Sequence, residues 1–108
     1  MSSKVFLTDS AVSDLEELDA YIIEYDSLQS ADDVLIQIEE VINSLSELPE
    51  RGTYPQELLS LGIRDYREVF FKPYRIIYRV IKNKVYIYLI VDGRRDMQAL
   101  LKRRLLEA

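Results

Sequence analysis

Apolar residues recur at helical spacing through the first half of the chain and predict two amphipathic helices. The first has Asp9 or Ser10 as its N-cap and runs to Tyr25, and the second begins near Ser30 and ends at Pro49. Only a few residues separate the two helices, so they must lie antiparallel. They therefore form an αα-hairpin whose joint apolar face needs a sheet to cover it.

Short apolar runs elsewhere predict four strands, at about residues 4–8, 63–71, 74–81 and 85–91. Lys72-Pro73 and Lys82-Asn83 mark the two turns between the last three strands. A basic terminal helix over residues 95–106 completes the chain, and we expect it to pack loosely. The order β-α-α-β-β-β-α predicts an α+β fold, in which an αα-hairpin packs on a small, mainly antiparallel four-stranded sheet. At 108 residues the chain forms a single domain, residues 1–108.

The third strand carries arginines at alternating positions. A period of two places Arg75 and Arg79 on one face of the sheet, with Ile77 between them, and Tyr78 on the other face. Repeated arginine on one strand face predicts an anionic or acidic partner.

Composition limits the chemistry. The chain has no cysteine and no histidine, which leaves no thiol nucleophile and removes the commonest general base and metal ligand. We therefore expect no cofactor and no metal. No basic N-terminal segment precedes an apolar stretch, and no apolar run approaches the roughly 18 residues of a membrane span, so we expect a soluble, cytoplasmic protein without membrane contact.

Charge is distributed unevenly along the chain. Residues 1–50 carry thirteen acidic side chains and one basic side chain, whereas residues 51–108 carry thirteen basic and six acidic ones. The net charge of -5 therefore conceals an acidic hairpin and a basic second half. This separation favours one binding surface on the basic half.

Several strings in this order resemble the RelE/ParE superfamily of bacterial toxins from type II toxin–antitoxin modules. They are RGTYPQEL, DYREVFFKPYRIIYRV and VDGRRD, and together they lean towards the ParE branch. The resemblance covers nearly the whole chain. It implies a small toxin that a cognate antitoxin holds inactive, in a hetero-oligomeric complex, by folding into a groove between the hairpin and the sheet.

The two branches of the superfamily differ in function. ParE-like members inhibit DNA gyrase by binding, and a surface of that kind would use the exposed basic side chains of this chain. The candidates are Arg67, Arg75, Arg79, Arg94, Arg95, Arg103 and Arg104.

RelE-like members instead are ribosome-dependent nucleases that cut mRNA. A nuclease would need a base, cations on the phosphate and an acid for the leaving oxygen. The candidates are Arg67, Glu68, Arg75, Tyr78 and Arg95, with Tyr66 as a second choice of base and Arg79 as a further cation.

Asp92 stands where many nuclease relatives have a histidine. Arg94 and Arg95 should lower the pKa of this carboxyl, so it cannot serve as the acid at neutral pH. The ParE-type interpretation is therefore favoured over the nuclease. A third alternative is an inactive member that still binds its antitoxin.

Overall fold

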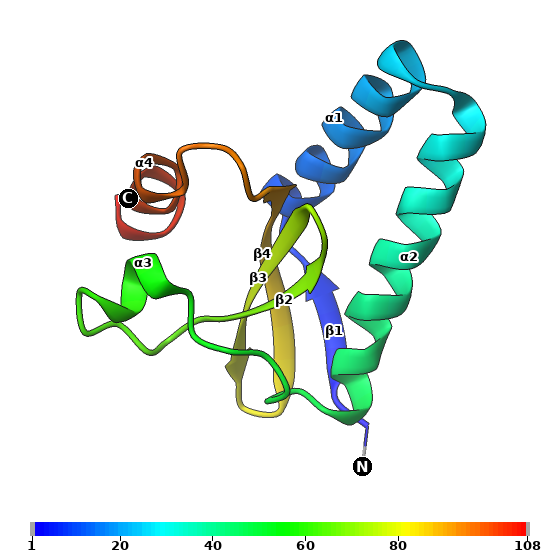
Figure 1. Cartoon of the computed structure of the whole chain (residues 1–108). Coiled ribbons are helices and arrows are strands. Elements are labelled where there is room, and N and C mark those ends of the chain that lie inside the picture. The colour runs from blue at the N-terminus through cyan, green and yellow to red at the C-terminus, as the bar shows by residue number, and fades with distance from the viewer. Residues whose placement is uncertain (1, 108) are drawn as a thin grey trace.

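The computed structural model describes residues 2–107, and its elements follow the predicted order with one short helix added (Figure 1). The elements are β1 (Lys4–Leu7), α1 (Asp9–Tyr25), α2 (Leu28–Glu47), α3 (Gln56–Leu59), β2 (Arg67–Phe71), β3 (Tyr74–Ile81), β4 (Lys84–Asp92) and α4 (Met97–Leu101), which a π-helical segment, Lys102–Leu106, prolongs. The predicted α+β fold is confirmed. No helix within residues 2–107 is long and apolar enough to span a bilayer.

Side-chain caps set the start of each long helix. The Thr8 hydroxyl accepts a hydrogen bond from the Ala11 amide at 3.1 Å, one residue before the predicted N-cap. The Ser27 hydroxyl accepts from the Ser30 amide at 3.0 Å, so α2 begins at Leu28 and not near Ser30. Helix α2 ends at Glu47, two residues before the proline that was expected to stop it.

The four strands form one sheet in the order β1-β4-β3-β2. β1 runs parallel to β4, and the other two pairs are antiparallel, as predicted. Lys82 and Asn83 both adopt positive φ, 50° and 65°, which closes a two-residue turn between β3 and β4.

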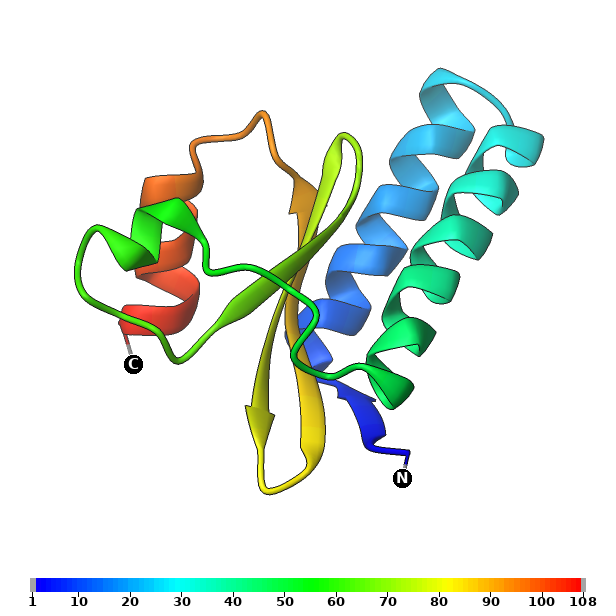
Figure 2. The same ribbon diagram turned by 60° about the horizontal axis from the view of Figure 1, so that its bottom comes forward.

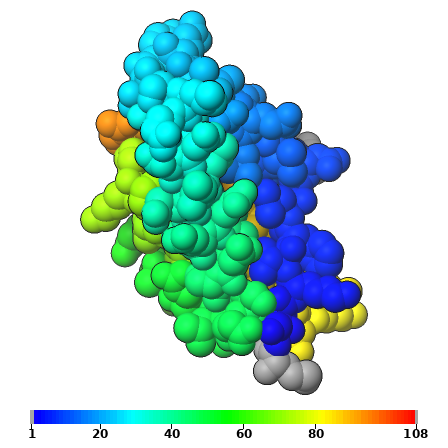
Figure 3. Space-filling view, turned by 90° about the vertical axis from the view of Figure 1, so that its right-hand side faces the viewer, coloured from blue at the N-terminus to red at the C-terminus, as the bar shows by residue number. Residues whose placement is uncertain are grey.

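Both faces of this sheet are covered (Figure 2). The αα-hairpin packs on one face, hereafter the hairpin face, and its core comprises Ala11, Ile38, Ile42, Leu45, Val69, Ile76, Tyr78, Val85, Ile87 and Ile90. Figure 3 shows α1 and α2 side by side over the outside of this layer.

Helices α3 and α4 cover part of the opposite face, hereafter the α4 face. Its core comprises Leu58, Ile77, Leu89, Val91, Met97, Leu100 and Leu101. The expectation of a loosely packed terminal helix is wrong, because Met97, Leu100 and Leu101 are each at most 5% exposed.

A bulge in β4 lets one strand serve both layers. Ile77 pairs with Leu89 and Tyr78 with Ile87, so Tyr88 is the extra residue. Ile87 and Ile90 consequently both enter the core under the hairpin although they are three residues apart. A strict period of two does not predict this.

The second strand is shorter than predicted. It begins at Arg67, not at residue 63, because the chain before it turns out of α3. The amide of Ile63 donates to the carbonyl of Leu58 at 3.0 Å, after Gly62 adopts a φ of 78°. The connection between α2 and β2, for which no helix was predicted, therefore contains the helical turn α3.

Candidate functional site

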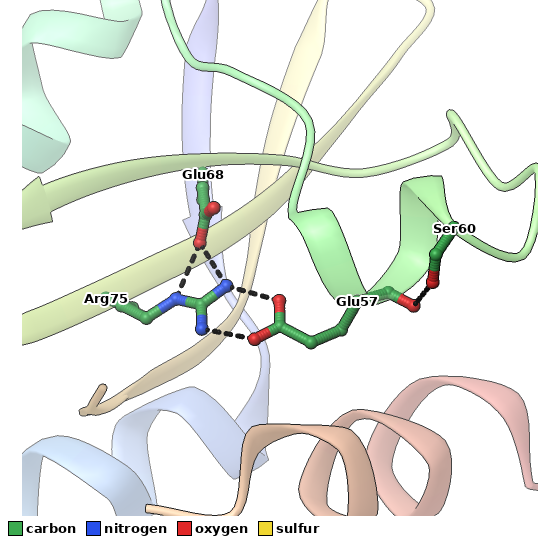
Figure 4. Close-up of polar contacts among 4 residues, drawn as sticks. All are labelled: Glu57, Ser60, Glu68 and Arg75. Atoms are coloured by element: carbon green, nitrogen blue, oxygen red, sulfur yellow. Dashed lines mark hydrogen bonds and ion pairs between the residues drawn. The ribbon is translucent and has the colours of Figure 1, made fainter. Parts of the chain in front are cut away.

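Arg75 sits between two carboxylates and not on an open surface (Figure 4). Its Nε donates to Glu68 Oε1 at 2.7 Å, and its two terminal nitrogens donate to the two oxygens of Glu57 at 2.8 Å each. The side chains of Arg75, Glu57 and Glu68 are 13%, 22% and 7% exposed. Two carboxylates on one guanidinium give this cluster a net negative charge, so it does not attract an anion.

The two carboxylates of this cluster differ in acidity. Hydrogen bonds from Arg75 hold the pKa of Glu57 below its usual value. Burial raises the pKa of Glu68, and the hydrogen bond from Arg75 opposes that rise only in part. The raised pKa makes Glu68 a stronger base than an ordinary glutamate, but Arg75 already occupies one of its oxygens.

Local structure explains why Arg75 lies here. A Cβ atom on Gly93 would come within 2.7 Å of Arg75 Cδ, so only glycine leaves room for this side chain. Glu57 comes from α3, whose end is fixed by a hydrogen bond of 3.1 Å from the Ser60 hydroxyl to the carbonyl of Glu57 (Figure 4). This partner was not among the predicted site residues, because no helix was predicted between Pro49 and residue 63. Pro55, directly before α3, was the available signal for a helix start.

Arg67 and Tyr78 belong to the hairpin face. They pair across β2 and β3, and the Tyr78 side chain is fully buried, with its hydroxyl accepting from the Gly52 amide at 3.0 Å. Arg67 donates to the Gly52 carbonyl at 2.9 Å and lies 4.7 Å from the ring centroid of Tyr54. Both side chains hold the loop that contains Gly52 against the sheet edge.

The five nuclease candidates therefore do not converge. Glu68 and Arg75 lie on the α4 face, whereas Arg67 and Tyr78 lie on the hairpin face. Arg95 stands apart from both pairs, in the turn between β4 and α4. A substrate phosphate could not contact all five groups at once.

Other arginines also have intramolecular partners. Arg79, on the α4 face as predicted, pairs with Asp65 at 3.3 Å. Arg94 pairs with Asp92 at 2.6 Å, and this hydrogen bond lowers the pKa of Asp92, which confirms the predicted direction.

Among Arg79, Arg94 and Arg104, the Arg104 side chain is the least exposed. It binds both oxygens of Asp14 at 3.1 and 3.0 Å and also donates to the carbonyl of Tyr88 at 3.0 Å. The side chains of Arg104 and Asp14 are only 20% and 10% exposed. Arg104 is thus a structural link between α1, β4 and the C-terminal segment.

Arg95 and Arg103 differ from the rest. Both are exposed, and within residues 2–107 neither forms an ion pair. They meet at a shallow pocket of about 380 Å³ between α1 and the C-terminal segment.

A larger pocket of about 490 Å³ adjoins the shallow one. Arg94 and Arg95 line it together with Tyr21 and Tyr74, which the sequence analysis had not considered as site residues. No linear signal marks this pocket, because Tyr21 lies 53 positions before Tyr74 and 73 positions before Arg94, and α1 and the end of β4 meet only in the fold. We call the three exposed arginines Arg94, Arg95 and Arg103 the basic edge.

Among residues 2–107, no group of three or more His, Cys, Asp or Glu side chains is placed to hold a metal ion.

The fold resembles solved toxins of two kinds. The chromosomal ParDE toxin–antitoxin system of P. aeruginosa matches with a TM-score of 0.71 and 18% identity, over 84% of this chain and 96% of that one. The RelBE2 toxin–antitoxin complex of Mycobacterium tuberculosis matches with a TM-score of 0.58 and 22% identity, over 85% and 92%. A mutant of the E. coli toxin RelE in the free state matches with a TM-score of 0.62 and 17% identity, over 97% and 100%.

Sequence comparison is more specific than the shared fold. No curated protein matches the chain. Residues 5–97, however, match the sequence model of a family described as the ParE toxin of the type II toxin–antitoxin system parDE. Because this match spans most of the 108 residues, the chain belongs to the ParE family of toxins within the RelE/ParE superfamily.

Proposed function

We propose that this chain is a ParE-type toxin that inhibits DNA gyrase by binding it and not by catalysis. The observation that carries the proposal is the distribution of the nuclease candidates over two faces of the sheet, with Tyr78 buried and Glu68 paired to Arg75. Membership of the ParE family supports the same choice between the two branches.

The basic edge is the proposed contact surface for gyrase. Its arginines are exposed, and it adjoins a pocket whose lining includes the apolar side chain of Leu18 and two tyrosines. Cationic and aromatic groups are typical of residues that anchor protein interfaces, and the carboxylates of Asp14, Glu17 and Asp92 also line this pocket. Arg75, Arg79 and Arg104, by contrast, are each paired with a carboxylate, and Arg67 is held by the Gly52 carbonyl and the Tyr54 ring, so we do not assign these four arginines to the contact with gyrase.

A cognate antitoxin is the second proposed partner. Two of the solved relatives are themselves toxin–antitoxin assemblies. We propose that the antitoxin of this chain folds into the groove between the hairpin and the sheet and that an acidic segment of it covers the basic edge. Neutralisation would then follow from direct competition with gyrase, in a hetero-oligomeric complex.

The test is a supercoiling and DNA-cleavage assay with purified gyrase and the purified chain. We expect loss of supercoiling and accumulation of cleaved plasmid, and we expect Arg95→Ala and Arg103→Ala to weaken both effects by about tenfold or more. Arg64→Ala is the matched control, because Arg64 is also exposed but lies outside the basic edge. Cleavage of translated mRNA with unaffected gyrase would support the RelE-type nuclease instead, and no effect on either would support an inactive member.

A further inference from the structure

One end of the α4 face has no helix over it. Helices α3 and α4 cover Ile77, Leu89 and Val91, but the two strands continue past them to the turn at Lys82 and Asn83 (Figure 2). The tip of this β3–β4 hairpin also projects beside β1 below the two long helices (Figure 3). Side chains on this end of the α4 face are therefore accessible.

A row of aromatic and cationic side chains crosses the open end of the sheet. The strand register aligns Phe6 with Tyr86 and Tyr86 with Arg79. The rings of Phe6 and Tyr86 stack at a centroid distance of 5.5 Å and an interplanar angle of 21°, and the Arg79 guanidinium lies 5.7 Å from the ring centroid of Tyr66. Phe6 is 41% exposed although it is a large apolar residue.

A second row beside it is positively charged. Lys4 and Lys84 pair directly across β1 and β4, on the same face as Phe6 and Tyr86. Like charges in such a position destabilise a sheet. Lys82 adds a third exposed charge in the adjoining turn, and none of the three lysines forms an ion pair within residues 2–107. An anion that binds here would relieve their repulsion.

We infer that this surface binds single-stranded nucleic acid. We call it the stacking strip, formed by Phe6, Tyr86, Arg79 and Tyr66 with Lys4, Lys82 and Lys84. Ligands that carry both negative charges and flat π faces match its two rows, and an unpaired nucleic-acid strand presents both at each nucleotide. An acidic peptide would use the lysines but leave the rings without a function.

The acidic hairpin does not prevent this binding. The hairpin packs on the opposite face of the sheet, and charges separated by more than about 10 Å in exposed positions are largely screened at 0.1 M salt. Among the described residues, Arg79 is the one cation of the strip with an ion-pair partner, Asp65, whereas Lys4, Lys82 and Lys84 have none. The local charge is therefore positive even though the chain as a whole is negative.

Binding can be measured by fluorescence anisotropy of labelled oligomers of about 10 nucleotides, dT or rU, with the purified chain at about 0.1 M salt, where the charge of the hairpin is screened. We expect both single strands to bind more tightly than a duplex of the same length. Phe6→Leu and Tyr86→Leu should each weaken binding about fivefold or more, because the π face is lost while an apolar side chain remains. Lys4→Gln and Lys84→Gln should each lower the slope of log K against log salt concentration by about 0.7.

Matched controls lie at the other end of the sheet. Phe70 is exposed to a similar degree, 44%, and Lys72 occupies the opposite turn, so Phe70→Leu and Lys72→Gln should leave binding unchanged. Circular dichroism of every variant shows whether it is folded.

Several outcomes would overturn the inference. One is that neither strand binds at about 0.1 M salt, and another is that the strip and control variants weaken binding equally. A third is that the chain binds polyglutamate with an affinity that Phe6→Leu does not change, which would identify an acidic protein segment as the ligand. A preference between dT and rU supports the inference and identifies the natural strand. Gyrase is absent from this assay, so its result is independent of the proposed function.

Discussion

A single carboxylate completes the sheet where its edge strand stops. β1 pairs with β4 only as far as Leu7 and Ile87, and beyond that point the Ile90 amide donates to Asp14 at 3.1 Å while the carbonyl of Tyr88 accepts from Arg104. Asp14 and Arg104 therefore replace the missing strand partner at the bulge. The ion pair satisfies backbone groups that burial would otherwise leave unpaired.

Removing the cation from this pair should destabilise the fold. Arg104→Met leaves the Asp14 carboxylate, which is only 10% exposed, without its partner, and breaking a buried pair in this way typically costs 3–5 kcal/mol. Because Arg104 retains some solvent contact, we expect a loss of about 3 kcal/mol in the free energy of unfolding, measured with urea. Arg103→Met, on an exposed neighbour, should change it by less than about 0.5 kcal/mol, and equal effects of the two variants would argue against a structural role for Arg104.

Glu57 should contribute stability that depends on pH. Arg75 holds the pKa of this carboxyl below its ordinary value of 4.5, so its contribution is present above that value and is lost as the pH falls through the lower, folded-state pKa. Glu57→Gln removes the contribution. The difference in unfolding free energy between the original chain and this variant should therefore be largest near neutral pH and shrink below pH 4.5. A difference that stays constant from about pH 7 to about pH 3 would refute this assignment.

At the scale of elements, periodicity predicted the parts of the fold that obey a regular repeat. The two long helices and the last three strands were predicted because their apolar residues recur at 3.6 or 2 positions. The bulge at Tyr88 breaks that repeat, and α3 is a single turn too short to show one. Both misses come from local geometry that only tertiary contacts stabilise.

The terminal helix gives a direct test of how the second layer is held. Leu101 is 1% exposed and belongs to the core of the α4 face, so Leu101→Ala should lower the free energy of unfolding by about 2–5 kcal/mol. Leu106 lies in the following segment and is 42% exposed, which makes Leu106→Ala the matched control with an expected loss below about 1 kcal/mol. The free energies of unfolding are measured by thermal or urea denaturation. If both variants lost less than about 1 kcal/mol, the terminal helix would be loosely packed after all.

At the scale of the whole molecule, the charge pattern of the sequence predicted only part of the candidate site. The sequence shows which arginines alternate along a strand, but it does not show that Glu57, Asp65 and Asp14 come from distant segments to neutralise them. The exposed arginines of the basic edge lie outside that strand. Electrostatic partners depend on tertiary distance, which a linear pattern does not contain.

The molecule as a whole thus separates two layers of different charge. The acidic hairpin covers one face of the sheet, the stacking strip lies on the opposite face, and the basic edge adjoins α1 beyond the end of β4. We propose that an antitoxin and gyrase compete for the basic edge. We propose that toxicity comes from binding at the basic edge.

The decisive experiment is to express the chain without an antitoxin in bacterial cells. DNA breaks, the DNA-damage response and cleavage of translated mRNA are then scored in the same cells. We predict DNA damage with intact mRNA, and we predict that Arg95→Ala abolishes the damage while Arg64→Ala does not. Cleaved mRNA without DNA damage would contradict the claim and would make Glu68 and Arg75 the residues to test next.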